Sequence, residues 1–245
     1  METETIDIPV ENPNPQDWIL LEDDALIAFR KPAMLPTQPD PTGDVSLAEL
    51  AEKYCESKLY VLHRLDRPTS GVVVFAKTEQ AAAALSHQFQ ERSTRKTYLA
   101  VVEQKPEKAE DTLVHFLKIG KENSKTIAYA EPSGNLKRAE MRYILRGSSD
   151  RYHLLEIELL TGRHHQIRAQ LAAIRCPIKG DVKYGARRAN ADRAIHLHAW
   201  RLAFRHPTTL ENVTLEADLP SGDAVWDFFQ KQITTVSGHI SEQLT

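Results

Sequence analysis

Cysteine is scarce in this chain, since Cys55 and Cys176 are the only two among 245 residues. They lie far apart and have neither the short spacing of a metal site nor that of a paired redox motif. Isolated thiols of this kind are typical of proteins from a reducing compartment. We therefore expect two reduced cysteines in a cytoplasmic protein, which excludes a disulfide-stabilised secreted fold.

Long apolar runs are also missing, since none approaches the ~20 residues that a bilayer-spanning helix needs. The first four residues, METE, are acidic, whereas a secretory leader begins with basic residues and continues with an apolar segment. These absences predict a protein with neither a membrane anchor nor a secretory signal. Hydrophobic residues still make up 41% of the chain, so a sizeable core can form.

Positive charge is absent from residues 1–29, which hold eight acidic residues and no Lys or Arg, although the net charge of the whole chain is only −3. Residues 162–205 reverse this balance, with ten Lys or Arg against Asp181 and Asp192, a local net charge of +8. A basic stretch within an acidic chain is typical of a polyanion-binding site. A solvated charged surface is the alternative that charge alone leaves open.

Strand patterns dominate the sequence, with a few helical patterns between them. Apolar runs predict strands at residues 18–21, 25–29, 60–62, 72–76, 97–102, 138–146, 151–160, 196–204 and 213–217. Ser46 and Thr78 are expected to cap helices that end near residues 56 and 92, and two more helices are expected over 164–175 and 223–231. Without regular βαβ alternation, this order predicts an α+β fold with a mixed, largely antiparallel β-sheet flanked by helices.

Composition divides the chain into three parts. Residues 1–16 contain three prolines among acidic and polar residues and predict an irregular acidic N-terminal arm. Residues 17–232 hold every expected strand and helix, and we interpret them as a single domain. Residues 233–245 are expected to form a flexible C-terminal tail. No internal repeat marks a second domain, and we expect a monomer.

Asp66 is the first candidate for chemistry. It follows a strand-like run and precedes the β-branched run at 72–76, and its neighbours His63, Arg64 and Arg67 are cationic or can become so. Such neighbours hold a carboxylate ionised, which suits a nucleophile or a base. Arginine-flanked carboxylates are also common as structural ion pairs, so this pattern alone leaves both interpretations open.

The segment around Asp66, HRLDRPTSG at residues 63–71, resembles the defining motif of the RluA-type pseudouridine synthase family. Further segments are similar to that family in the expected order, and they are Lys31-Pro32, RKTYLA at 95–100, TGRHHQIR at 161–168, PIKGD at 177–181, Tyr184-Gly185, LHA at 197–199 and FRHP at 204–207. Together they cover roughly residues 17–220. The resemblance implies a pseudouridine synthase-like fold with a central RNA-binding cleft.

The resemblance also implies an activity: isomerisation of a uridine in a stem-loop of ribosomal or transfer RNA to pseudouridine. A C–N glycosidic bond breaks, the base rotates and a C–C bond forms, with no net oxidation, so no cofactor is implied. By resemblance Asp66 is the catalytic carboxylate, which either attacks the sugar carbon or removes a ribose proton. An RNA-binding or remodelling module with dispensable catalysis, and a hydrolase that cleaves nucleosides, are the rival interpretations.

Three further residues match residues of known role in the family. Arg168 matches the arginine that pairs with the carboxylate, and a bidentate guanidinium would orient Asp66 and keep it ionised. Tyr98 matches the tyrosine that stacks on the target base, a contact of ~1–3 kcal/mol per base. Arg64 matches the arginine that fills the stack after the base has flipped out, and a phosphate contact is its alternative role.

Basic residues near these motifs are expected to contact RNA, mostly through phosphates, which position the RNA without reading its sequence. The expected contacts are His63, Arg64, Arg67, Arg95, Lys96, Arg163, His165, Arg187 and Arg188, with Arg92 and Arg193 as further phosphate contacts. A metal site is not expected, because the adjacent His164 and His165 should point apart on a helix and no Cys or acidic residue completes a ligand set.

Two departures from the family pattern stand out. Many members carry a small S4-like N-terminal RNA-binding domain, but only about 16 residues precede the first expected strand here, so we expect that domain to be lacking. The family commonly has a glycine shortly after the Lys-Pro pair, where this sequence has Met34. We interpret the second departure as a loop difference with little effect on chemistry.

Overall fold

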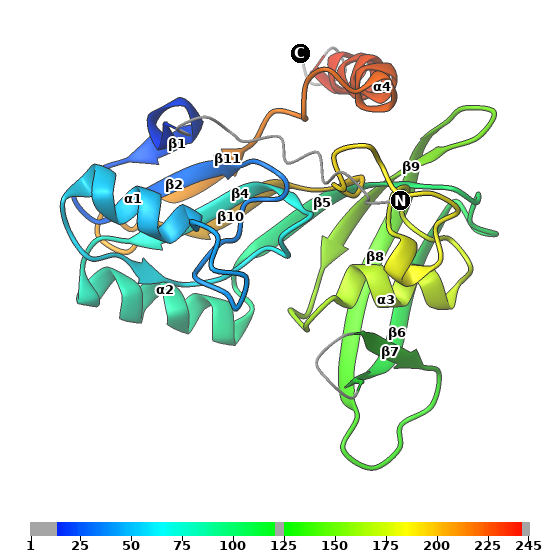
Figure 1. Cartoon of the computed structure of the whole chain (residues 1–245), viewed down its shortest axis with the longest axis horizontal. Helices are drawn as coiled ribbons and strands as arrows, with labels where there is room; N and C mark the ends of the chain where they lie inside the picture. The colour runs from blue at the N-terminus through cyan, green and yellow to red at the C-terminus, as the bar shows by residue number, and fades with distance from the viewer. Residues whose placement is uncertain (1–13, 121–124, 242–245) are drawn as a thin grey trace, which may run out of the picture.

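The computed structural model describes residues 14–120 and 125–241 (Figure 1). The strands are β1 (Ile19–Glu22), β2 (Leu26–Lys31), β3 (Tyr60–Val61), β4 (Ser70–Ala76), β5 (Arg95–Val102), β6 (Glu110–Ile119), β7 (Thr126–Tyr129), β8 (Lys137–Ser148), β9 (His153–Leu159), β10 (Leu197–Arg205) and β11 (Asn212–Glu216). The helices are α1 (Leu47–Cys55), α2 (Glu79–Glu91), α3 (Gln166–Ala173) and α4 (Ala224–Ser241), with 3-10 turns η1 (Pro15–Trp18) and η3 (Val182–Tyr184).

All eleven strands belong to one sheet, in the order β1-β2-β4-β10-β5-β9-β8-β6-β7, with β11 paired to β10 and β3 to β4. Within the described residues every pairing is antiparallel except that of β4 with β10. That parallel contact is short, with His198 opposite Ser70 and Ala199 opposite Gly71. The predicted α+β class with a mixed, largely antiparallel sheet is confirmed.

Local sequence explains the elements that were predicted. The side chain of Ser46 accepts from the Glu49 N–H while Glu49 accepts from the Ser46 N–H, so α1 begins with a full capping box. Thr78 caps α2 with a single bond, in which its side chain accepts from the Ala81 N–H. All seven residues of β4 are buried, as a continuous β-branched run predicts for a central strand.

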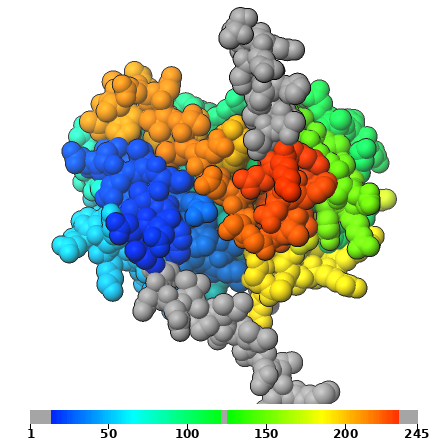
Figure 2. All heavy atoms as spheres, turned by 90° about the horizontal axis from the view of Figure 1, so that it is seen from above, coloured from blue at the N-terminus to red at the C-terminus, as the bar shows by residue number. Residues whose placement is uncertain are grey.

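The helices cover different faces of the sheet (Figure 1). Along β5, Ala100 and Val102 pack in the core that α3 covers, whereas Leu99 and Val101 pack beneath α4 on the opposite face. Figure 2 shows α4 lying between the part of the molecule built from the first strands and the part built from β6 to β9. Tyr98, on the α3 side of β5, also packs against the core of α1, so α1 and α3 flank one face of the sheet.

Two parts of the fold differ from the prediction. Strands β6 and β7 were not expected, and they form the last pair at the β7 edge of the sheet. Helix α4 continues to Ser241, so the segment proposed as a tail from residue 233 is helical as far as that residue. The arm at 1–13 and residues 242–245 lie outside the described residues.

Within the described part of the chain, none of the helices combines the length and the hydropathy that crossing a bilayer requires. We propose that residues 17–232 form one domain, and the single continuous sheet supports this proposal.

Candidate active site

A cavity of about 850 Å³ opens on the face of the sheet that carries α1 and α3. Its walls come from the segment before β4, the end of α2 with the start of β5, and the end of β9 with the start of α3. Asp66, Tyr98 and Arg168, which lie far apart in sequence, all line it. The volume is within the range of about 300–1,000 Å³ typical of ligand pockets.

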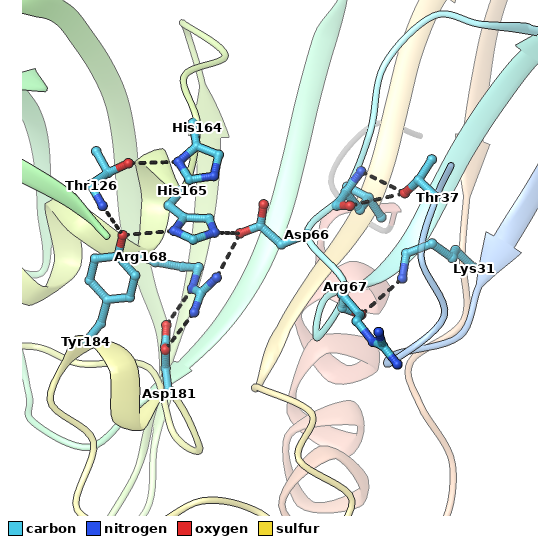
Figure 3. Close-up of polar contacts among 11 residues, drawn as sticks. Lys31, Thr37, Asp66, Arg67, Thr126, His164, His165, Arg168, Asp181 and Tyr184 are labelled. Atoms are coloured by element: carbon cyan, nitrogen blue, oxygen red, sulfur yellow. Dashed lines mark hydrogen bonds and ion pairs between the residues drawn. The ribbon is translucent and has the colours of Figure 1, made fainter. Parts of the chain in front are cut away.

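Asp66 lies in the turn between β3 and β4, and its carbonyl oxygen accepts from the Thr69 N–H at 2.9 Å. The residue before it is fixed by Thr37, whose hydroxyl donates to the Leu65 carbonyl at 3.1 Å and accepts from the Leu65 N–H at 3.2 Å (Figure 3). These bonds aim the Asp66 carboxylate toward α3.

The structure shows why glycine, here Gly71, occupies the last position of the HRLDRPTSG segment. Its φ is +118°, and a Cβ atom there would lie 2.2 Å from the carbonyl oxygen of Ala199 on β10. Only glycine therefore permits the parallel contact of β4 with β10. That contact places the Asp66 turn over the same sheet face as Tyr98.

Lys31 supports the Asp66 turn from below. Its fully buried ammonium donates to the carbonyls of Pro32 at 2.9 Å, Leu35 at 2.7 Å and Arg67 at 3.3 Å. Burial lowers the pKa of Lys31 to about 7, partly opposed by the nearby Asp66 charge. The loop that Lys31 holds contains Met34 at φ +67°, so a non-glycine residue adopts the left-handed conformation at the position where the family commonly has glycine.

Arg168, on α3, joins two carboxylates. Its Nε and Nη2 donate to the two oxygens of Asp181 at 2.7 and 2.8 Å, and its Nη1 donates to Asp66 Oδ2 at 3.1 Å. Burial would lower the pKa of Arg168, but the hydrogen bonds and charges of Asp181 and Asp66 raise it above its usual value. The expectation of a bidentate contact with Asp66 is wrong, because Nε and Nη2 bind Asp181 and Asp66 is bound through Nη1 alone.

Asp181 was not singled out from the sequence as a site residue. Its side chain is only 1% exposed, and it holds the guanidinium in place beneath the cavity. The signal was present, because Asp181 is one of two acidic residues in the basic stretch 162–205 and lies in the PIKGD segment. An acidic side chain that is buried within a basic segment must pair with one of the basic residues.

Tyr98 lies in the middle of β5, opposite Ile157 of β9 and Ala199 of β10. Burial, and secondarily the Asp66 charge, raise the pKa of its phenol above the usual value. The ring is therefore neutral and partly buried in the cavity wall. A neutral aromatic ring beside a carboxylate is suited to hold a planar base.

His164 and His165 do not lie within the helix, which begins at Gln166. His165 is the N-cap residue and has a φ of +49°, and the two rings stack with centroids 3.8 Å apart. The expectation that they point apart is wrong, because the left-handed backbone at His165 turns its side chain beside that of His164. Among the described residues, no group of three or more His, Cys, Asp or Glu is arranged to hold a metal.

Basic side chains surround the cavity opening, and those that line it are Arg64, Arg92, Arg95, Lys96 and Arg163. Arg64 is exposed, whereas Arg95 pairs with Glu158 at 3.0 Å. Lys96 lies 5.4 Å from the ring centre of Phe89, and burial lowers its pKa. Five basic residues at one opening form an anion-attracting rim.

Of the six other residues expected to contact RNA, His165 is the N-cap residue described above and Arg193 lies outside the cavity lining. The other four have different environments. Arg67 donates to the Met34 carbonyl and to Thr42 and pairs with Asp44, so it holds the loop beneath Asp66 and does not line the cavity. Arg187 and Arg188 lie outside the cavity lining, and the Arg187 N–H donates to Glu103.

The remaining one, His63, does line the cavity. Its Nε2 accepts from the Val74 N–H at 3.1 Å, and burial lowers the pKa of its ring to about 3. His63 is therefore a neutral ring that packs 5.1 Å from Phe89, rather than a cation facing a phosphate.

Comparison with known proteins identifies the family of this chain. Residues 25–173 match the family model described as RNA pseudouridylate synthase. The tRNA pseudouridine synthase C of Haemophilus ducreyi is 34% identical over 87% of this chain and 94% of its own length. The ribosomal large subunit pseudouridine synthase C of Rickettsia bellii is 32% identical over 84% of this chain and 69% of its own length.

A solved structure has the same fold. Human RNA pseudouridylate synthase domain containing 4 superposes with a TM-score of 0.69 at 25% identity, covering 84% of this chain and 90% of that one. The match of the family model to more than half of the chain, together with the two relatives, confirms the resemblance drawn from the HRLDRPTSG and TGRHHQIR segments. The chain belongs to the RluA-type family of RNA pseudouridine synthases, enzymes that isomerise uridine in RNA.

Proposed function

We propose that Asp66 is the catalytic carboxylate of this enzyme and that its target is a uridine in a stem-loop of transfer or ribosomal RNA. The observation that carries the proposal is the contact of Asp66 Oδ2 with Arg168 Nη1 at 3.1 Å inside the cavity. The guanidinium donates a hydrogen bond to Asp66 and orients its carboxylate toward whatever enters the cavity. Asp66 is also only one quarter exposed, so a bound base would exclude water from it.

The reaction assigns a task to each group. The C1′–N1 bond of uridine breaks while Asp66 acts on the ribose, either by bonding to C1′ or by taking a proton from C2′. The detached uracil turns on the Tyr98 ring and bonds to C1′ through C5. As that bond forms, the Asp66–C1′ bond breaks or, in the other case, Asp66 returns its proton to C2′. The C5 proton is then lost as N1 gains one. Atoms and charge balance within the nucleotide, so the scheme uses no oxidant and no cofactor.

The rim explains how a base inside folded RNA could reach Asp66. Arg64 is exposed at the opening and stands two residues before Asp66, so it can enter the stack that a flipped base leaves. Arg92, Arg95, Lys96 and Arg163 would neutralise phosphates on either side. These are sequence-independent contacts and favour recognition of a compact stem-loop by shape.

Transfer RNA is the first target to test. The tRNA-modifying relative from Haemophilus ducreyi is matched over 94% of its length, against 69% for the ribosomal one from Rickettsia bellii. The monomeric state and the cytoplasmic location stay predictions. Analytical ultracentrifugation would test the monomeric state.

The experiment compares wild type with Asp66→Asn on total tRNA and rRNA from a strain lacking this enzyme, with pseudouridine mapped by sequencing. We expect wild type to form pseudouridine at defined sites and Asp66→Asn to form none while it still binds the same RNA. Pseudouridine formation by Asp66→Asn would contradict the assignment of the carboxylate. Release of free uracil would instead identify a hydrolase, and growth rescue by Asp66→Asn would favour an RNA-binding module with dispensable catalysis.

A further inference from the structure

A chain of hydrogen bonds approaches Asp66 from the side opposite Lys31 (Figure 3). The Thr126 N–H, at the start of β7, donates to the Tyr184 hydroxyl oxygen at 2.8 Å. The Tyr184 hydroxyl lies 3.0 Å from Nδ1 of His165. On the other side of the same ring, His165 Nε2 lies 3.6 Å from Asp66 Oδ2. His165 thus stands between a phenol and the catalytic carboxylate.

The partners of the Tyr184 hydroxyl decide where the His165 proton lies. A phenol has one proton to donate, and its oxygen already accepts from Thr126. His165 Nδ1 lies 3.0 Å from this phenol, and the Thr126 hydroxyl, also close to it, makes its own hydrogen bond with His164 Nδ1 at 2.9 Å. The Asp66 carboxylate opposite Nε2 requires a proton on that nitrogen, which leaves Nδ1 as the acceptor. Tyr184 therefore donates to Nδ1, and a neutral His165 must carry its proton on Nε2, directed at Asp66.

Neutrality of His165 follows from its surroundings. Its side chain is 11% exposed, and burial lowers the pKa of the ring to about 3, although the Asp66 charge opposes this shift. Arg168, His164 and Lys183 also face it and disfavour a second positive charge. A neutral donor can hold Asp66 without competing with it for a proton.

We propose that His165 is a positioning residue, whose Nε2–H and Arg168 Nη1 together hold Asp66 Oδ2 and leave Oδ1 as the oxygen that acts on the ribose. This inference rests on the proposed role of Asp66. The two oxygens of Asp66 differ in the structure, since both contacts go to Oδ2 and, within the described residues, Asp66 Oδ1 has no hydrogen bond or ion pair. A separation of 3.6 Å is longer than a hydrogen bond, and such contacts shorten when substrate closes the site.

The test uses two substitutions that separate the N–H of His165 from its ring. His165→Gln keeps a donor near the Nε2 position but loses the aromatic ring, whereas His165→Phe keeps the ring and loses the donor. Single-turnover rates with excess enzyme and the dissociation constant for the target RNA are measured for both. His153→Gln, on β9 and outside the cavity lining, is the matched control and should keep the wild-type rate.

We expect His165→Phe to slow single turnover by about 10- to 100-fold, the scale of one lost hydrogen bond to a charged group. His165→Gln should be the faster of the two, and RNA affinity should stay within about twofold of wild type, as positioning rather than binding requires. Tyr184→Phe keeps the ring beneath Arg168 but frees the His165 tautomer, and we expect it to be slower by about 3- to 10-fold.

Three results would overturn the proposal. His165→Phe matching or exceeding His165→Gln would show that the ring only packs. A loss of RNA affinity at an unchanged single-turnover rate would make His165 an RNA contact. A wild-type rate for Tyr184→Phe would remove the tautomer argument, and that variant decides if His165→Phe does not fold. Asp66→Asn is measured in the same experiment. If Asp66→Asn is inactive and the His165 variants do not behave as expected, only this inference is refuted. If Asp66→Asn is active, the proposed function is refuted.

Discussion

Asp66 and Asp181 share the guanidinium of Arg168, and their environments predict opposite consequences when each becomes Asn. Asp181 is 1% exposed and accepts two N–H bonds, whereas Asp66 is 25% exposed and accepts one. Asp181→Asn places an amide NH₂ against a guanidinium donor and leaves Arg168 charged and buried. Asp66→Asn leaves Arg168 paired with Asp181. We expect Asp181→Asn to impair mainly stability and Asp66→Asn to impair mainly catalysis.

The magnitudes follow from the same contacts. Removing one partner of a buried ion pair costs about 3–5 kcal/mol, and the remaining contact with Asp66 puts Asp181→Asn near the lower end. Asp66→Asn exchanges one partly exposed hydrogen bond for a weaker one and should cost about 1 kcal/mol. At a urea dependence of about 2 kcal/mol per molar, the two variants should differ by about 1 M in unfolding midpoint.

The assay is urea unfolding of both variants in parallel with single-turnover pseudouridine formation. Asp181→Asn should retain activity within about 100-fold of wild type, since Asp66 and Arg168 remain and only their placement changes. Asp66→Asn should retain none. Equal stability of the two variants, or a cost below about 1 kcal/mol for Asp181→Asn, would refute the view that Asp181 anchors Arg168.

Two further perturbations test the supports of the Asp66 turn. Gly71→Ala should lower the free energy of unfolding in urea by about 3 kcal/mol or more, because its Cβ would meet the Ala199 backbone. Gly43→Ala is the control, since Gly43 also has a positive φ but has open space around it, and it should lose about 1 kcal/mol. Equal losses would contradict the close approach of Gly71 to Ala199. Burial lowers the pKa of Lys31 to about 7 in the folded protein, so between pH 7 and about 10 the unfolded chain binds more protons than the folded one. The free energy of unfolding should therefore rise with pH over this range, by up to about 1.4 kcal/mol per pH unit. Lys31→Met should lack this rise in the same unfolding experiment.

The parts of the fold that sequence predicted are those in which local pattern and burial agree. β4 is buried along its whole length, so its β-branched run needed no partner to be recognised. β6 is different, because its apolar residues fall in adjacent pairs, with Leu113 buried beside the exposed Val114. That spacing is compatible with a helix as well as with a strand. The segment is a strand because it pairs with β8, which the sequence pattern does not show.

The site shows the same limit. The resemblance placed Asp66, Tyr98 and Arg168 in one site, and all three line the cavity. It did not reveal which carboxylate takes the two strong bonds of Arg168, since that depends on where the turn at Asp181 brings its side chain. The sequence pattern predicted a helix that includes His164 and His165, whereas the backbone at His165 is left-handed and the two rings stack. Backbone conformation at one residue is set by tertiary contacts, here those of Tyr184 and Asp66.

Charge along the chain is a poor guide to charge at the site, although it first suggested a polyanion partner. Residues 162–205 carry the basic excess, but only Arg163 and Arg168 from that stretch line the cavity, and Arg168 is neutralised by two carboxylates. Most of the rim comes from the end of α2 and the start of β5, outside the basic stretch, where Arg92, Arg95 and Lys96 stand against Glu91. Alternating strand faces and the short contact of β4 with β10 bring these residues together. The basic rim of the cavity is therefore a product of the sheet topology, and the basic stretch contributes chiefly Arg168, which contacts Asp66.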